Sequence, residues 1–122
     1  MKKNLYIVAI ILSVLAVITF ASCDVIEAQG LMEDFVDDVN DQNWSSLQQY
    51  THSDASDYLA GGSGTFWSGI FDIYRPLDLI VTTDSAATVE GDDGTMFYFT
   101  LEDDGGDMKI SGILRGSTTV FD

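Results

Sequence analysis

Disulfides cannot stabilise this chain, because Cys23 is the only cysteine among its 122 residues. A chain of this length suits one small domain. Such a domain buries somewhat more than roughly 60% of the surface that it exposes when unfolded. The sequence therefore predicts a modest core that is held by packing alone.

Basic residues are also scarce. The chain has 5 Lys and Arg against 20 Asp and Glu, and only Arg75, Lys109 and Arg115 follow Cys23. Nucleic acids and anionic lipid headgroups need cations to neutralise their phosphates, so no nucleic-acid partner is expected. The acidic balance is compatible with a cationic partner, with divalent cations in the medium, or with a merely solvated surface.

Proline and histidine occur once each. Pro76 cannot lie inside a helix and pushes Arg75 toward an extended conformation, so it predicts the end of the helical half of the chain. His52 is the one side chain suited to proton transfer near neutral pH. Its Thr-His-Ser-Asp setting favours a solvent-exposed or loop-bracing role, since adjacent Ser53 and Asp54 do not make a catalytic triad.

A long apolar run occurs at the N-terminus. Two lysines precede the apolar residues 5–20, and small residues follow them, which is the order of an exported precursor. We therefore expect residues 1–22 to be a signal peptide and residues 23–122 to be a single extracytoplasmic domain. Two alternatives are an uncleaved signal anchor, since the run is near the length that spans a bilayer, and a cleaved signal that leaves Cys23 an ordinary thiol.

The sequence Phe20-Ala21-Ser22-Cys23 resembles the lipobox of bacterial lipoproteins. The resemblance implies that Cys23 is diacylated and becomes the new N-terminus, which would anchor the domain to a membrane of the cell envelope. Two or more acyl chains hold a protein stably in a bilayer. Asp24 resembles an inner-membrane retention signal, but sorting rules differ among bacteria, so the sequence leaves the membrane undecided.

Helical periodicity covers the first half of this domain. Residues 26–40 carry an apolar stripe and an acidic opposite side, which predicts an amphipathic helix. A second short helix is expected at residues 44–50, with Asn43 as its N-cap. The glycine-rich residues 61–64 predict a break in regular structure, and residues 65–71 predict a third helix. The stripe consists of Leu31, Met32, Phe35, Val36 and Val39.

The period changes from 3.6 to 2 after Pro76. Strands are expected at residues 77–83, 86–90, 95–101, 108–114 and 117–121. The third is expected to be central because it carries large side chains on both faces, and residues 102–107 to form a hairpin loop. The predicted fold class is α+β, with N-terminal helices packed on a curved antiparallel sheet.

Three stretches carry a family resemblance. They are Asn40-Asp-Gln-Asn-Trp44-Ser-Ser-Leu47 between two helices, Phe97-Tyr-Phe-Thr-Leu101, and Gly105-Gly-Asp-Met108-Lys109-Ile110. Together they resemble the nuclear-transport-factor-two-like (NTF2-like) superfamily over most of residues 25–116. The resemblance implies a cone-shaped α+β domain, complete or incomplete. It implies no single activity, since this fold hosts enzymes and inert binding domains, and no acid matches a catalytic position.

Aromatic residues and acidic loops are the remaining candidates for a site. The aromatic side chains can line a pocket for an apolar ligand or form the core itself. The acidic residues 91–94 and 102–107 suggest a calcium site. They lack the spacing of an EF-hand, however. Hairpin turns rich in Asp and Gly explain them. No metal or cofactor is expected. The candidate pocket lining is Trp44, Tyr50, Trp67, Phe97 and Phe99.

The sequence thus predicts a membrane-tethered, acidic extracytoplasmic lipoprotein domain with a non-enzymatic binding or envelope-associated role. The alternative is a binder of a small apolar ligand, or a weak enzyme, that uses a pocket inside the cone. Whether the partner is a protein or a small molecule stays open.

Overall fold

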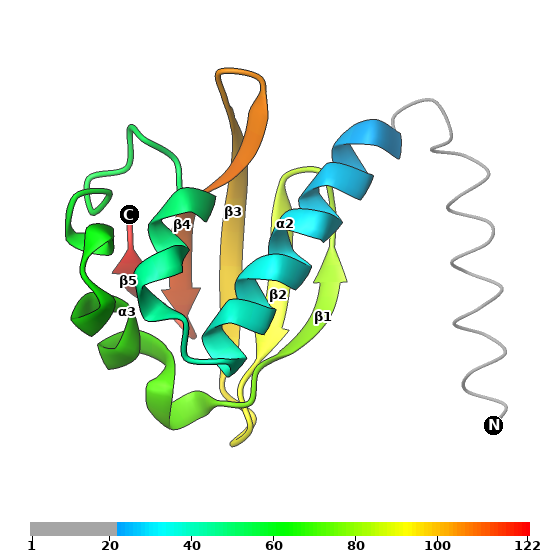
Figure 1. Cartoon of the computed structure of the whole chain (residues 1–122). Helices are drawn as coiled ribbons and strands as arrows, with labels where there is room; N and C mark the ends of the chain where they lie inside the picture. The colour runs from blue at the N-terminus through cyan, green and yellow to red at the C-terminus, as the bar shows by residue number, and fades with distance from the viewer. Residues whose placement is uncertain (1–21) are drawn as a thin grey trace, which may run out of the picture.

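The computed structural model describes residues 22–122, which form helices followed by strands (Figure 1). The helical elements are α2 (Ser22–Asn40), η1 (Trp44–Tyr50), η2 (Ala60–Gly62), α3 (Gly64–Phe71) and η3 (Asp72–Tyr74), where η denotes a 3-10 helix. The strands are β1 (Asp78–Thr82), β2 (Ala86–Glu90), β3 (Met96–Asp104), β4 (Asp107–Arg115) and β5 (Thr118–Phe121).

The five strands form one antiparallel sheet in the order of the chain, with β3 at its centre. The helices lie on one face of this sheet, and α2 crosses it diagonally (Figure 1). Register shifts interrupt the β1–β2, β3–β4 and β4–β5 pairings. Such bulges bend strands and increase their twist. The predicted α+β class, with helices on a curved antiparallel sheet, and the central position of β3 are therefore confirmed.

The core lies between the helices and the inner face of the sheet. Phe35 of α2 is at its centre, and its ring makes edge-to-face contacts with four other rings at centroid distances of 5.4 to 6.0 Å. Aromatic pairs favour this arrangement over a face-to-face sandwich. The four partners are Tyr50, Trp67, Phe71 and Phe99.

The helical half differs from the prediction at three boundaries. α2 begins at Ser22 rather than at residue 26, and the carboxylate of Asp24 in its first turn favours such an extension. Asn43 does not cap η1 with its side chain, and its Nδ2 donates to Asp38 Oδ1 at 3.2 Å. Within the glycine-rich residues 61–64, Gly61 and Gly62 belong to η2 and Gly64 begins α3, so the predicted break in regular structure is confined to Ser63, which is extended.

Gly61 has a specific packing role in that stretch. The indole Nε1 of Trp67 donates to the carbonyl oxygen of Gly61 at 2.7 Å. A Cβ atom at Gly61 would lie 3.1 Å from the indole ring. Glycine therefore allows the backbone to approach the buried tryptophan closely.

The hairpin between β3 and β4 is longer than predicted. Residues 102–104 and 107 belong to the strands, so the prediction of a loop at residues 102–107 is wrong. Gly105 and Gly106 form the turn, with φ values of 65° and 104°. Glycine adopts such values without strain, and a turn with two positive φ angles fits the twist of a hairpin. The ladder can therefore continue to the pair Asp104 and Asp107.

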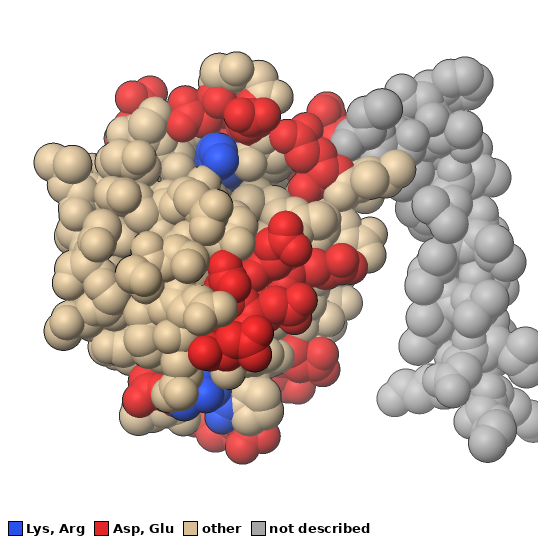
Figure 2. Space-filling view, in the orientation of Figure 1, with Lys and Arg blue, Asp and Glu red and all other residues tan. Residues whose placement is uncertain are grey.

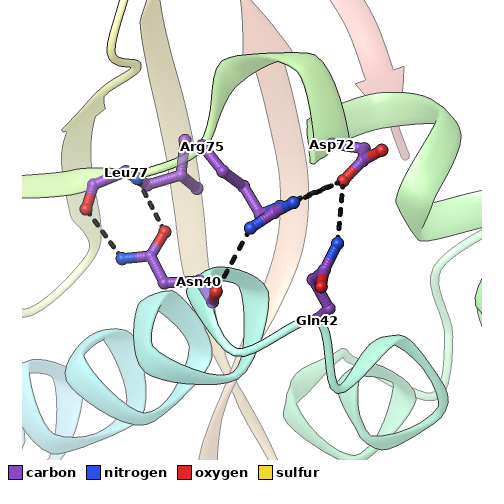
Figure 3. Close-up of polar contacts among 5 residues, drawn as sticks. All are labelled: Asn40, Gln42, Asp72, Arg75 and Leu77. Carbon is purple, nitrogen blue, oxygen red and sulfur yellow. Dashed lines mark hydrogen bonds and ion pairs between the residues drawn. The ribbon is translucent and has the colours of Figure 1, made fainter.

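Polar contacts join the helical half to the sheet (Figure 3). The Asn40 side chain donates to Leu77 O at 3.0 Å and accepts from Leu77 N at 2.7 Å. Arg75 pairs with Asp72 at 2.9 Å and donates to the carbonyl of Asn40, the last residue of α2, at 3.3 Å. A cation at a helix C-terminus is favourable. Arg75 is extended, as predicted from Pro76.

Candidate functional site

A solvent-open hollow of about 510 Å³ lies on the outer face of the sheet, where the chain after η1 reaches β4. Thr100 and Glu102 of β3 reach it because they alternate with the inward-facing Phe99 and Leu101. The C-terminal residue also contributes. The full lining is His52, Asp54, Ala55, Ser56, Thr100, Glu102, Ser111, Gly112 and Asp122.

His52 is the most buried polar group of this lining, with 9% of its surface exposed. Its backbone N–H donates to Ile110 O at 2.8 Å, which places the residue against β4. Its ring nitrogen Nε2 lies 2.9 Å from Asp103 O. Its Nδ1 accepts from the backbone N–H of Asp54 at 3.1 Å. Both ring nitrogens are therefore engaged with backbone groups, in agreement with a loop-bracing role.

Ser53 extends this contact to the end of β3. Its backbone N–H and its Oγ donate to Asp104 Oδ2 at 2.9 and 2.8 Å. These two bonds hold the pKa of Asp104 below its ordinary value, and the bond from the backbone N–H contributes more than the bond from the hydroxyl. We call the contacts of His52 with Asp103 and of Ser53 with Asp104, together with the bond from the Asp54 N–H to the His52 ring, the clasp.

The hollow is acidic. Asp54, Glu102 and Asp122 line it, and no Lys or Arg does. The nearby Lys109 Nζ donates to Gln49 O at 2.7 Å. The arrangement can accept hydrogen bonds from a ligand and can attract cationic groups to the hollow.

A second acidic region lies on α2, where Figure 2 shows a band of carboxylates across the molecule. Tyr50 Oη donates to Asp38 Oδ2 at 2.6 Å beside this band. Partial burial raises the pKa of Tyr50 well above its ordinary value, and the carboxylate of Asp38 raises it further. The exposed acids of α2 are Asp24, Glu27, Glu33, Asp34 and Asp37.

The aromatic residues that sequence patterns offered as pocket lining lie in or against the core. Trp67, Phe97 and Phe99 are buried, with exposed fractions of 0 to 2%, and Trp44 and Tyr50 are half-buried against them. None of the five lines the hollow. Their position is that of the interpretation in which the aromatic side chains build the core.

The acidic turns are held by their own backbone contacts. Asp93 Oδ1 accepts from Thr95 N at 2.9 Å, and this bond lowers the pKa of Asp93. Asp103 Oδ2 accepts from Gly106 N at 3.3 Å in the other turn. Within residues 22–122, His, Cys, Asp and Glu side chains form no group of three or more that could hold a metal ion.

The N-terminal predictions fall mostly outside the described residues. Residues 1–21 are not described, and the structure says nothing of the side chain of Cys23. Its lipidation stays a prediction. No helix within the described part of the chain is long and apolar enough to cross a membrane.

No family model, curated protein or solved structure matches this chain. The site therefore has to be interpreted from its own chemistry. Sequence patterns singled out His52 and Asp54 but not the strand residues Thr100, Ser111 and Gly112. The signal that could have found them is the outward position of small and hydroxyl side chains on two paired strands.

Proposed function

We propose that this chain is a membrane-tethered, acidic extracytoplasmic lipoprotein whose domain, residues 23–122, has a non-enzymatic binding role at the cell envelope. The hollow beside His52 is the observation that carries the binding role. Its volume of about 510 Å³ is within the range of roughly 300–1,000 Å³ that is usual for ligand pockets. It can hold a small ligand or a side chain of a partner.

The engagement of His52 favours binding over catalysis. A general base must lie within about 2.6–3.2 Å of the proton that it removes. Both ring nitrogens of His52 already contact backbone groups, at 2.9 and 3.1 Å. Neither is free to face a substrate in the hollow.

Charge indicates the chemistry of the partner. The three carboxylates of the hollow accept hydrogen bonds and attract cations. Complementary charge steers encounter and selects partners. A partner with amine or guanidinium groups, from a polypeptide or from a small molecule, fits this hollow best.

The start of α2 supports a short tether. The helix includes Ser22 and Cys23, and from Asp24 onward the first buried side chain is that of Ala28. Five residues of helix span about 8 Å. A lipid on Cys23 would therefore hold the domain close to the bilayer.

The order of elements is compatible with the NTF2-like resemblance, although it is an order that the α+β class shares generally. Helices come first, and a curved antiparallel sheet follows and packs on them. The alternative function, a small apolar ligand or weak enzymatic activity inside a cone, has less support. The space between helices and sheet holds Phe35, Trp67, Phe71 and Phe99, whose rings pack on one another.

Fatty-acid labelling tests the anchor. We expect Cys23→Ser to lose both the incorporated label and the membrane fraction of the protein. Ser22→Ala is the matched control, because it keeps a small residue before the cysteine, and it should retain both. A labelled, membrane-bound Cys23→Ser protein would refute lipidation at this residue.

Titration with the polyamine spermine tests the hollow. The double variant Asp54→Asn, Glu102→Gln removes two of its carboxylates, whereas the control Asp84→Asn, Asp92→Asn removes two exposed carboxylates elsewhere. Exposed charge pairs contribute about 0.2–1 kcal/mol each. We expect the hollow variant to bind spermine roughly 2- to 30-fold more weakly than the control. Equal weakening in both variants would mean that spermine responds to net charge alone.

A further inference from the structure

The hydrogen bonds of His52 fix its protonation state in this structure. Nδ1 accepts from the backbone N–H of Asp54 and therefore carries no proton. A neutral imidazole then has its proton on Nε2, which donates to Asp103 O at 2.9 Å. The clasp thus requires the neutral ring in its Nε2–H form.

Protonation of this ring conflicts with the clasp. An imidazolium has a hydrogen on both nitrogens, so its Nδ1–H would point at the N–H of Asp54 across 3.1 Å. Two donors cannot bond each other, so protonation removes the hydrogen bond between the Asp54 N–H and Nδ1. The turn at Asp54 then loses this contact to the ring.

The charges around His52 favour a rearrangement of this turn. Asp54 on its own loop, Glu102, Asp103 and Asp104 on β3, and Asp122 at the C-terminus are all carboxylates near the ring, and Lys109 on β4 is the cation on this side. These carboxylates can accept hydrogen bonds from the two N–H groups of a protonated ring. The carboxylate of Asp54 is an acceptor that a rearranged turn can offer.

We propose that His52 is a pH-sensitive latch that sets the shape of the hollow. In its neutral form it holds the turn at Asp54 against β3 and β4. In its protonated form it releases the N–H of Asp54, and residues 54–56, which line the hollow, change position. Histidine is the side chain that ordinarily changes charge between pH 5 and 8, so the hollow should differ between these two pH values.

Nuclear magnetic resonance of the ¹⁵N-labelled full chain in detergent micelles tests the latch directly. His52 is the only histidine, so its imidazole signals need no assignment. We expect the Nε2–H form at pH 8, and the amide signals of Asp54, Ala55 and Ser56 to shift with the same midpoint as the ring. An Nδ1–H form at pH 8, or amide signals that do not follow the ring, would overturn the proposal.

Hydrogen exchange gives the size of the effect. The protection factor of the Asp54 amide should fall roughly two- to tenfold from pH 8 to pH 5, the factor expected for one lost hydrogen bond. The amide of Thr95 is an internal control, because it makes the same kind of contact, to Asp93 Oδ1, without a histidine. Equal changes at both amides would contradict the latch.

The variant His52→Asn separates the latch from general effects of pH. Asparagine places an acceptor near the position of Nδ1 and does not titrate. We expect the amides of residues 54–56 in this variant to keep their signals from pH 8 to pH 5. A pH response like that of the wild type would show that another group causes it. If the variant does not fold, the tautomer of the wild-type ring still decides the proposal.

Discussion

The two faces of strand β3 differ strongly in exposure to solvent. On the inner face, Phe97, Phe99 and Leu101 have exposed fractions of 0 to 2%. On the outer face, Tyr98 is 44% exposed, and Thr100 and Glu102 are exposed beside the hollow. One strand therefore builds the core with every second residue and the candidate site with the others.

Strand β3 has its stabilising residues on one face and its candidate binding residues on the other. Burial of apolar surface is the main favourable term in folding, and in β3 it lies on the inner face. Polar contacts at the outer face contribute less, because they replace contacts with water. Substitutions on the outer face can thus test binding without unfolding the domain, and substitutions on the inner face cannot.

The largest contrast is expected between two adjacent residues. Phe99→Ala should destabilise the domain by about 3–5 kcal/mol, since truncating a buried phenylalanine leaves a cavity. Tyr98→Ala, on the exposed side of the same strand, should cost less than about 1 kcal/mol. Urea unfolding followed by tryptophan fluorescence measures both. Similar losses for the two variants would mean that the outer face is covered in solution.

The alternation in β3 was predictable because it is a local property of the sequence. Residues 95–101 show a period of two with large side chains, and β2 has the predicted bounds, Ala86–Glu90. The prediction is wrong at residues 102–104, whose acidic side chains resemble a loop. The turn at Gly105 and Gly106 allows the ladder to continue past them, and the glycine pair was the available signal.

The candidate site was not predictable from local patterns. His52 meets Asp103, and Ser53 meets Asp104, across 51 positions of the chain. Such pairs depend on how far β3 extends and on where the loop after η1 crosses β4. Periodicity indicates which face of an element is buried, but it does not indicate which loop reaches that element.

A buried hydrogen bond tests whether polar contacts in the core contribute more to stability than exposed ones. Trp67→Phe removes the donor to Gly61 O and leaves a buried carbonyl without its partner, as well as a small cavity. We expect a loss of about 2–3 kcal/mol in the free energy of unfolding. Ser68→Ala, which removes an exposed contact of the same helix to Thr65 O, is the control. An equal effect of the two substitutions would show that burial of the indole N–H does not matter.

Substitutions at the junction between helices and sheet should have an intermediate effect on the free energy of unfolding. Asn40→Ala removes two hydrogen bonds to the backbone of Leu77 in a half-buried position, and should cost about 1–2 kcal/mol. Gln49→Ala, which removes an exposed bond to Ser46 O, should change stability by less than about 0.5 kcal/mol. Chemical unfolding at pH 7 gives both values. A neutral Asn40→Ala would mean that the contacts in Figure 3 follow from the fold without stabilising it.

The smallest effect on stability is expected from a substitution in the clasp, and it should appear only at low pH. An unfolded aspartate has a pKa of about 3.9. In the folded state the pKa of Asp104 is lower, because Ser53 donates two hydrogen bonds to its carboxylate. Its contribution to stability is therefore present above about pH 4 and is lost as the pH falls through the lower folded value. The variant Asp104→Asn should show a shallower loss of stability than the wild type between about pH 4 and pH 2. Parallel curves would show that the clasp does not hold the carboxylate in solution. Because this window lies below pH 5, it also separates the response of Asp104 from the change that we expect at His52.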